Sequence, residues 1–267
     1  MAKQRPYISA LWHAVPSNIH ARLEQSIQRG IEDFHTSPQQ ASAVPKIFFR
    51  ADDIAIPSSQ CSAMLKIFAE HNTPLALAAV PAWSTPSRIE KLLSVAPNSN
   101  DLWCWHQHGW SHISHTLQGK KCEFGSNRPT EECVEELQQG TATLTSLLGD
   151  ALQPVFTPPW NRMGEDSITA VKELGFKAIS RSESAPKQNI LPDIPVNVDL
   201  HTRSELTAES GWNALLEELR AGIASGRCGV MLHHERMNPA AELFLQRLLI
   251  ILQSYPVQPV PLYPYML

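Results

Sequence analysis

The sequence has 267 residues, of which 43% are hydrophobic and 18% are charged, which is enough apolar material for a sizeable core and unlike a disordered or fibrous chain. The net charge of -4 and the pI near 6.3 argue against a nucleic-acid-binding protein, which usually has a basic face. No apolar run approaches the ~18 residues of a membrane span, and the N-terminus lacks a signal peptide pattern. We expect a cytoplasmic protein whose partners are small or neutral molecules, with no nucleic acid and an undefined oligomeric state.

The first expected element is an amphipathic helix near the N-terminus. Ser17 is its expected N-cap, and a polar loop follows over residues 35–45. The apolar residues recur at three- and four-residue spacing: Ile19, Leu23, Ile27, Ile31 and Phe34.

Short apolar runs then alternate with helical patterns along the rest of the chain. The expected strands are 46–51, 74–82, 101–106, 154–159, 176–180, 194–200, 228–234 and 257–263. The expected helices are 58–71, 85–96, 130–149, 165–175, 205–225 and 238–255. This alternation predicts parallel βαβ units in an α/β protein, either a closed barrel or a large doubly wound sheet. The glycine motifs that bind dinucleotides or nucleoside triphosphates are absent from the sequence.

Five cysteines are scattered along the chain, without a CxxC pair. An odd number at irregular spacing predicts neither a disulfide framework nor a thiolate zinc site. We expect reduced, mostly buried thiols.

Ionisable and aromatic residues follow five of the expected strands. The carboxyl ends of parallel strands are where chemistry collects in α/β folds, so we expect these residues to line one pocket. They are Arg50, Asp52 and Asp53; His106 and His108; Thr157, Trp160, Asn161 and Arg162; Asp199 and His201; and His233 and His234.

His108 and His112, in the segment HGWSH, are candidate metal ligands. Their spacing puts two imidazoles on one face of a helical turn, and Asp53 could supply a third, oxygen ligand. Two histidines and one carboxylate leave a coordination position open, as in a catalytic divalent-metal site. Two other interpretations stay open: such histidines are often surface or capping residues, and Asp52 and Asp53 are able to cap a following helix.

Two further histidines flank this pair. His106 lies two residues before His108 and so on the same face of the strand, where it could support a ligand or line the pocket. His115 follows His112 by three residues, and we expect it at the substrate mouth or as a fourth ligand.

The ordered set of motifs resembles the polysaccharide deacetylase superfamily, also called carbohydrate esterase family four, with its nodulation-type chitooligosaccharide deacetylases. The matching segments are ADD at 51–53, HGWSH at 108–112, TPPW at 157–160, Asp199 in NVDL, and MLHH at 231–234. The resemblance extends from residue 46 to residue 234 and implies a distorted (β/α) barrel with seven or so parallel strands. We expect one domain over residues 1–267, in which residues 1–45 are an N-terminal helical extension.

The resemblance also implies an activity, that of a metal-dependent deacetylase hydrolysing the N-acetyl amide of a sugar or glycan precursor. Its cofactor would be one divalent ion bound by Asp53, His108 and His112, with Zn2+ expected first and Co2+, Ni2+ or Fe2+ as alternatives. Asp52 would be the general base and His233 the general acid.

Further residues of the matching segments would support this chemistry. Trp160 would form an apolar wall for the acetyl group or the sugar, and Asp199 would raise the pKa of His233. Asn161 and His234 are also expected at the site.

Two departures from the family pattern affect these assignments. Thr157 stands where the family has an arginine that pairs with the catalytic aspartate, and Arg50 or Arg162 could supply the missing guanidinium. The doublet of His233 and His234 leaves the position of the acid open, because strand alternation directs only one of them into the barrel mouth.

Three competing functions follow from the same residues. The first is a related amidase acting on a non-sugar amide or a cyclic ureide. The second is a catalytically decayed carbohydrate-binding barrel, suggested by Thr157. The third, a phosphoesterase, is disfavoured because such sites commonly bridge two metals with more acidic ligands.

Overall fold

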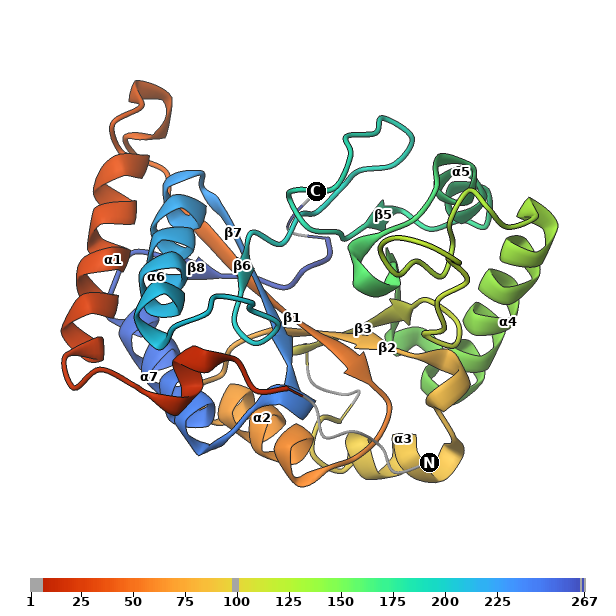
Figure 1. Ribbon diagram of the computed structural model, residues 1–267, viewed down its shortest axis with the longest axis horizontal. Coiled ribbons are helices and arrows are strands. Elements are labelled where there is room, and N and C mark those ends of the chain that lie inside the picture. The colour runs from red at the N-terminus through yellow and green to blue at the C-terminus, as the bar shows by residue number, and fades with distance from the viewer. Residues whose placement is uncertain (1–6, 98–100, 265, 267) are drawn as a thin grey trace. The chain divides into compact units, whose positions relative to one another are not determined.

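The computed structural model describes residues 7–97, 101–264 and 266, in which helices and strands alternate along the chain (Figure 1). The chain divides into two compact units. The first comprises Met1–Arg50, Ser58–Pro74 and Asn197–Val260, and the second comprises Ala51–Pro57, Leu75–Val196 and Pro261–Leu267. The strand β1 (Lys46–Ile54) contributes residues to both units.

The first unit combines elements from the two ends of the chain. Its strands follow the order β8, β1, β7, β6, in which β8 pairs with β1 and β6 pairs with β7 in parallel. Besides β1, its elements are η1 (Ala10–His13), α1 (Ile19–Phe34), η2 (Pro38–Gln40), α2 (Ser59–Glu70), β6 (Val198–Asp199), α6 (Ala208–Ala224), β7 (Arg227–His233), η6 (His234–Arg236), α7 (Pro239–Gln253) and β8 (Gln258–Pro259).

Aromatic side chains fix the N-terminal segment in the core of the first unit. Trp12 of η1 packs edge-on against Trp212 of α6, with ring centroids 5.1 Å apart, and both rings contact Phe244 of α7. The indole N–H of Trp12 donates to the carbonyl of Leu200 at 3.0 Å, so the buried ring keeps its hydrogen bond. The helix α1 starts at Ile19 with Asn18 at the N-cap, so the predicted cap at Ser17 is wrong by one residue.

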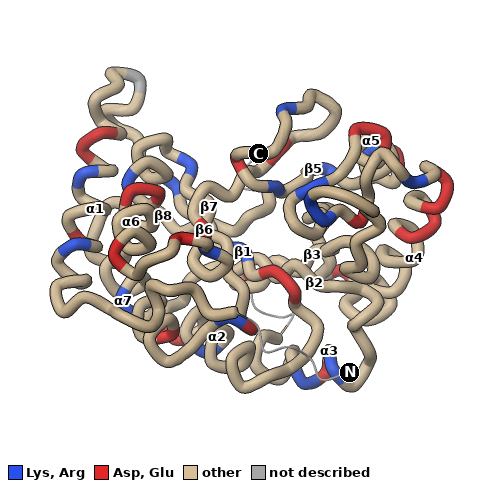
Figure 2. Tube along the Cα trace, in the orientation of Figure 1, with Lys and Arg blue, Asp and Glu red and all other residues tan. Residues whose placement is uncertain are grey.

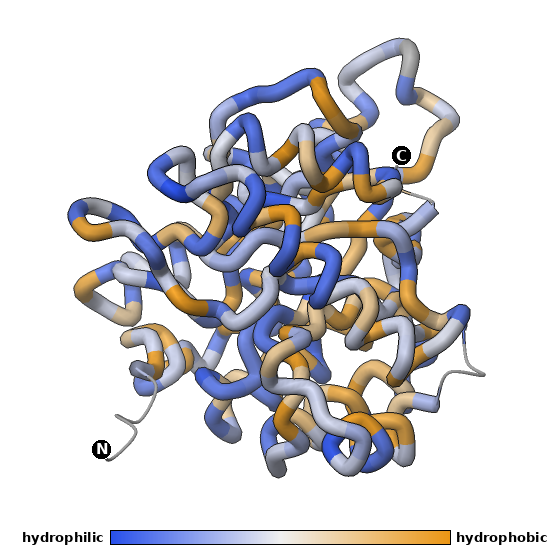
Figure 3. Tube along the Cα trace, turned by 90° about the vertical axis from the view of Figure 1, so that its right-hand side faces the viewer, coloured by the Kyte–Doolittle hydropathy of each residue, from blue (hydrophilic) through white to orange (hydrophobic). Residues whose placement is uncertain are grey.

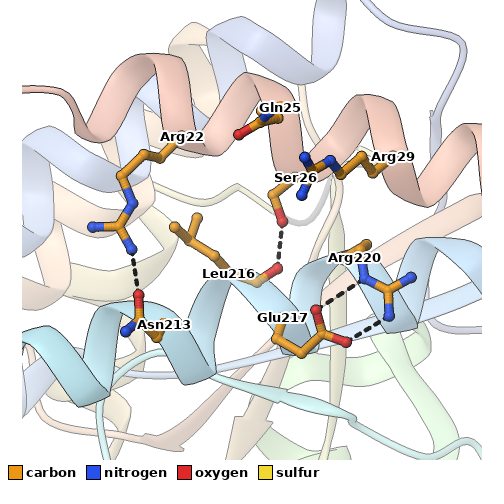
Figure 4. Close-up of a pocket in the computed structure, with 8 residues that line it drawn as sticks. All are labelled: Arg22, Gln25, Ser26, Arg29, Asn213, Leu216, Glu217 and Arg220. Carbon is orange, nitrogen blue, oxygen red and sulfur yellow. Dashed lines mark hydrogen bonds and ion pairs between the residues drawn. The ribbon is translucent and has the colours of Figure 1, made fainter.

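The helices α1 and α6 lie side by side and are joined by polar contacts (Figure 4). Arg22 donates to the side chain of Asn213 at 2.7 Å, and Ser26 donates to the carbonyl of Leu216. Residues of both charge signs occur on each of these helices (Figure 2). The contact of Arg22 is exposed and that of Ser26 is buried. The apolar residues between the helices supply most of the stability.

The second unit has the strand order β1, β2, β3, β4, β5, with every pair from β2 onward parallel. Its further elements are β2 (Leu75–Ala79), η3 (Pro81–Trp83), α3 (Pro86–Leu93), β3 (Trp103–His108), α4 (Thr130–Leu148), η4 (Gly149–Ala151), β4 (Leu152–Thr157), η5 (Pro159–Asn161), α5 (Glu165–Glu173) and β5 (Ala178–Ile179).

The pairing of β3 with β4 is irregular just before the strands end. Trp105 pairs with Leu152 but Gln107 pairs with Phe156, so β4 contains two extra residues in this interval. Pro154 lies within it and has no N–H to donate to a ladder, which accounts for the break. Beyond the irregularity, His108 pairs with Thr157.

Aromatic and aliphatic side chains fill the core of the second unit. Phe156 makes edge-on contacts with Phe124 and Phe176, at centroid distances of 5.8 and 5.6 Å. Leu137 of α4 and Ile168 of α5 belong to the same buried cluster, which covers β4. Apolar and polar segments alternate along the chain (Figure 3), as expected of elements that each bury one side.

The α/β fold class predicted from the sequence is confirmed, with parallel strands in the topology of a distorted (β/α) barrel. Within residues 7–97, 101–264 and 266, no helix has both the length and the apolarity that crossing a bilayer requires. The assignment of residues 1–267 to a single domain, with residues 1–45 as an extension, stays a prediction.

Candidate metal centre

The Asp-Asp pair lies at the end of β1, where the backbone leaves regular strand geometry. Asp52 is 3% exposed, and Asp53 has a φ of 62°, in the left-handed region that residues other than glycine rarely adopt. The helix α2 begins only at Ser59 and is capped by Ser58, so the interpretation of the Asp pair as a helix cap is wrong. The irregular backbone is the arrangement that a ligand role for one carboxylate requires.

His108 is the last residue of β3, and its ring is oriented by the neighbouring strand. Its Nδ1–H donates to the carbonyl of Thr157 at 2.9 Å, and its Nε2 lies 3.4 Å from Oδ1 of Asp53. A bond from one ring nitrogen to a backbone carbonyl fixes the tautomer of a metal-binding histidine. The lone pair of Nε2 is then directed to the Asp53 side.

His112 lies in an irregular loop, so the prediction that it shares a helical turn with His108 is wrong. Gly109 and His112 have φ values of 60° and 58°, and such left-handed residues are incompatible with a right-handed helix. The loop still brings the two imidazoles together, with ring centroids 5.2 Å apart. Nε2 of His112 lies 3.1 Å from Oδ1 of Asp53.

Asp53, His108 and His112 form the group that fits a divalent ion. Each of the three offers one ligand atom, and these atoms all lie within 4.8 Å of one another. Among the residues that the structure describes, this is the group of three or more histidine, cysteine or acidic residues that meets this condition. One carboxylate oxygen and two imidazole nitrogens are donors that suit zinc and several other divalent ions, and three ligands leave room for a water or a substrate. His115 is not in this group.

The electrostatics of the two imidazoles favour positive charge beside Asp53. Burial lowers the pKa of His108, but its bond to Asp53 and the charges of Asp52 and Asp53 outweigh burial, so the pKa lies above 6.5. Burial, helped by the charge of His108, lowers the pKa of His112 to about 4 against the opposing charge of Asp53. One positive charge is thus stabilised in this group.

Glu123 supports the loop that carries His112. Its side chain is fully buried and accepts hydrogen bonds from the backbone N–H groups of Trp110, Ser111 and His112, at 3.3, 2.7 and 2.9 Å. The hydroxyl of Ser111 also donates to it, at 3.0 Å. The sequence contains no motif that predicts this carboxylate, which lies eleven residues beyond His112 in a polar loop.

Two tryptophans flank the ring of His112. Trp160 lies 4.4 Å away between ring centroids, and Trp83 of η3 lies 5.5 Å away. Trp160 and Asn161 have φ values of 55° and 58°, so two consecutive residues after β4 are left-handed. Strained backbone of this kind is concentrated at functional sites. The structure thus brings the predicted Trp160 next to His112, whereas Trp83 was not predicted.

Thr157 is integrated into the site through both its backbone and its side chain. Its carbonyl orients His108, and its hydroxyl lies 2.9 Å from Nε2 of His106. The other ring nitrogen of His106 lies 3.1 Å from the carbonyl of Cys104. His106 therefore supports the strand end next to His108, as its two-residue spacing suggested.

The two candidate arginines have different surroundings. Arg162 donates to the carbonyl of Lys121 at 3.2 Å, and the ammonium of Lys121 lies 5.8 Å above the ring of Trp160. Arg50 is fully buried on β1, where it contacts the sulfur of Met231 at 3.3 Å.

The remaining predicted site residues belong to the first unit. The carboxylate of Asp199 accepts from the backbone N–H groups of His201 and Thr202, at 2.9 and 2.8 Å, and so fixes the turn after β6. Nδ1 of His201 accepts the backbone N–H of His233 at 3.0 Å. His233 is partly exposed, whereas His234 is 1% exposed at the start of η6.

His115 and the five cysteines lie outside the group of candidate metal ligands. The backbone of His115 is bonded to Cys122 and Asn127 within the loop after His112. The cysteines are free thiols, as predicted, and burial raises the pKa of Cys61, Cys104 and Cys228 to about 12.

Comparisons with known proteins identify the fold but give no sequence match. No model of a protein family matches the sequence, and no curated protein matches it. Several solved structures are similar to the chain. One is a Mycobacterium smegmatis protein assigned to the polysaccharide deacetylases, 16% identical, with a TM-score of 0.59 over 82% of this chain and 88% of that one.

Two further solved structures match the chain. A peptidoglycan N-acetylglucosamine deacetylase, solved with an N-hydroxybenzamide compound, is 12% identical with a TM-score of 0.52 over 83% of this chain and 87% of that one. A family 4 carbohydrate esterase pseudoenzyme from Bacillus anthracis is 12% identical with a TM-score of 0.47 over 80% of this chain and 63% of that one. The chain therefore has the fold of the polysaccharide deacetylase superfamily, as the motifs indicated.

Proposed function

We propose that this protein is a metal-dependent deacetylase that hydrolyses the N-acetyl amide of a sugar or glycan precursor. The observation that carries the proposal is the convergence of Oδ1 of Asp53 with the Nε2 atoms of His108 and His112, beside the buried Asp52. Fold alone does not imply activity, because one fold hosts many functions. The proposal therefore depends on this group of residues together with the sequence motifs.

Asp53, His108 and His112 would hold the ion. When bound, a divalent ion supplies Lewis acidity, which polarises an amide carbonyl and lowers the pKa of water. We propose Zn2+ first, with Co2+, Ni2+ or Fe2+ as alternatives. The hydrogen bond from His108 to Thr157 and the contacts of Glu123 keep both imidazoles in place for this role.

Asp52 is the proposed general base, and His233 the proposed general acid. Asp52 accepts a proton from water as the water oxygen attacks the carbonyl carbon. The C–N bond then breaks, and His233 protonates the departing amine, which leaves acetate and a free amino sugar. We place the acid at His233, which is partly exposed, rather than at His234, which is 1% exposed.

Two neighbouring groups would assist the reaction. Trp160 provides an aromatic surface next to His112, suited to the apolar face of a sugar or to an acetyl group. Arg50 is the better substitute for the family's arginine, since Arg162 is bonded to a backbone carbonyl. Arg50 and Asp52 are two residues apart on β1, a spacing that puts both side chains on one face of a strand.

Elemental analysis of the purified protein, with an acetate-release assay, tests this function. The panel contains N-acetylated sugars, nucleotide sugars, acetylated oligosaccharides, non-sugar amides and cyclic ureides. We expect about one divalent ion per chain and acetate release from at least one acetylated sugar. Turnover of an amide or ureide alone would instead establish the related amidase, and the cytoplasmic location is tested separately by cell fractionation.

A second function, a carbohydrate-binding protein without catalysis, is favoured by one observation. Thr157 occupies the position of the family's arginine, and its hydroxyl is bonded to His106 rather than to an acidic group. In that case the panel would show sugar binding by calorimetry, without acetate release in the presence of any of the four metals.

A further inference from the structure

We propose that Glu123 is a positioning residue that sets the geometry of the metal site before any ion binds, an inference that rests on the proposed function. Three successive backbone N–H groups, of residues 110–112, donate to its carboxylate. Consecutive N–H groups that converge in this way form a concavity for an anion. In this protein the anion is a side chain of the chain itself.

The surroundings show how tightly the carboxylate is fitted. A Cβ atom added at Gly109 would lie 2.1 Å from Oε2 of Glu123 and 2.6 Å from the ring of Pro159. Gly109 also has a φ of 60°. Glycine is therefore required both by the backbone conformation and by the close approach of the carboxylate.

The carboxylate acts on His112 through the backbone. The loop has no helical hydrogen bonds, so Glu123 satisfies N–H groups that regular structure leaves without acceptors. His112 adopts a left-handed conformation that is unfavourable for a bulky residue. The bond from its N–H to Oε1 of Glu123, at 2.9 Å, stabilises this conformation and so keeps Nε2 beside Asp53.

A metal site held in this way is preorganised. Without Glu123 the ion would have to order the loop when it binds, and the cost would appear as weaker affinity. Residues that orient metal ligands typically change the affinity by about 10–100-fold when they are replaced. Glu123 is thus expected to act on metal affinity without touching the ion or the substrate.

The test compares Glu123→Gln with Glu136→Gln. Glu136 is an acidic residue of the same unit, paired with Arg128 at 2.6 Å. Because Arg128 also donates to the backbone carbonyl of Glu123, at 3.3 Å, Glu136→Gln tests whether this backbone contact, rather than the carboxylate of Glu123, sets the affinity. Metal-free proteins are titrated with Zn2+ in competition with a chelator. We expect Glu123→Gln to weaken affinity by about 10–100-fold and Glu136→Gln to leave it within about twofold.

Hydrogen exchange of the metal-free proteins provides a readout besides affinity. The amides of residues 110–112 should be protected in the wild type and should exchange faster in Glu123→Gln, with the core strands unchanged. Ser111→Ala, which removes only the hydroxyl bond to Glu123, serves if Glu123→Gln does not fold, and should weaken affinity by about threefold.

The outcomes separate this inference from the proposed function. Failure of the wild type to bind Zn2+, Co2+, Ni2+ or Fe2+ would contradict both. The positioning role alone would be overturned if the wild type binds the ion and Glu123→Gln has unchanged affinity and unchanged exchange. Where Ser111→Ala replaces Glu123→Gln, unchanged affinity in Ser111→Ala would overturn it.

Discussion

His108 and His201 are both buried, yet their environments shift the pKa values of the two rings in opposite directions. Each has Nδ1 bonded to the backbone of an adjacent strand, His108 to the carbonyl of Thr157 and His201 to the N–H of His233. The first bond places the proton on Nδ1 and the lone pair on Nε2, whereas the second places the proton on Nε2. Only His108 can therefore present a lone pair at Nε2 while keeping its backbone bond.

The charges around the two rings differ as well. Asp53 raises the pKa of His108 against the effect of burial. Burial lowers the pKa of His201 well below 6.5, and the charges of His233, His234 and Arg236 lower it further. Nε2 of His201 has no hydrogen-bond partner among the described residues. A neighbouring carboxylate, rather than burial, therefore prepares an imidazole for a cation.

Replacing Asp53 should remove the carboxylate that distinguishes the environment of His108 from that of His201. Asp53→Ala deletes one of three ligand atoms and the negative charge. Zn2+ affinity should therefore fall by more than about 100-fold, because the loss of a residue that only orients a ligand already costs about 10–100-fold. Chelator competition measures the loss. Asp33→Ala, which removes a surface carboxylate paired with Arg220, is the control. Wild-type affinity in Asp53→Ala would mean that the ion binds elsewhere.

Replacing Asp52 should separate metal binding from catalysis. Asp52→Asn keeps the size of the side chain but removes the basic oxygen, so turnover should fall by about 10²–10⁴-fold. The metal content should remain near that of the wild type, because Asp52 is not in the ligand group. Acetate release and elemental analysis of the same preparation check both. Near-full activity would eliminate Asp52 as the base.

The environment of His201 predicts a dependence of stability on pH. Because its pKa is lower in the folded than in the unfolded protein, the unfolded protein binds the extra proton. Its contribution to the free energy of unfolding is present above pH 6.5 and is lost as the pH falls from 6.5 towards the folded pKa, by up to about 1.4 kcal/mol per pH unit.

Urea unfolding between pH 7.5 and pH 5 measures this slope. His201→Asn places an oxygen near the position of Nδ1, where it can accept the N–H of His233, but cannot be protonated. The variant should therefore lose less stability than the wild type over this interval. Parallel pH profiles for the two proteins would show that His201 does not contribute.

The smallest effect on metal binding is expected at Thr157, where backbone and side chain act on different histidines. Thr157→Val removes the hydroxyl bonded to His106 but keeps the carbonyl that orients His108. The free energy of unfolding should fall by about 1–3 kcal/mol, with Zn2+ affinity within about threefold. Thermal unfolding and chelator competition measure both, and a large loss of affinity would assign the hydroxyl a role at the metal.

The sequence predicted the fold well because hydrophobic periodicity is a local property. The strand ending at His108 and the helix beginning near Ile19 follow from such patterns, with a cap displaced by one residue from Ser17 to Asn18. The order and placement of the motifs also predict one group of Asp53, His108 and His112, whose ligand atoms lie within 4.8 Å of one another.

The sequence could not give the backbone conformation or the support of the site. Four-residue spacing suggested a helical turn for His112, but left-handed residues at 109 and 112 are stabilised by Glu123, a contact across eleven residues in a polar loop. Trp83 was missed for the same reason, since its contact with His112 joins different strand ends. Such contacts are set by tertiary structure, which periodicity does not report.

Anomalous diffraction from a crystal of the protein grown with Zn2+ locates the bound ion directly. One strong peak is expected within bonding distance, about 2.0–2.2 Å, of Oδ1 of Asp53 and of Nε2 of His108 and His112. An ion bound elsewhere, or no ion with these three side chains well ordered, would contradict the proposed metal site.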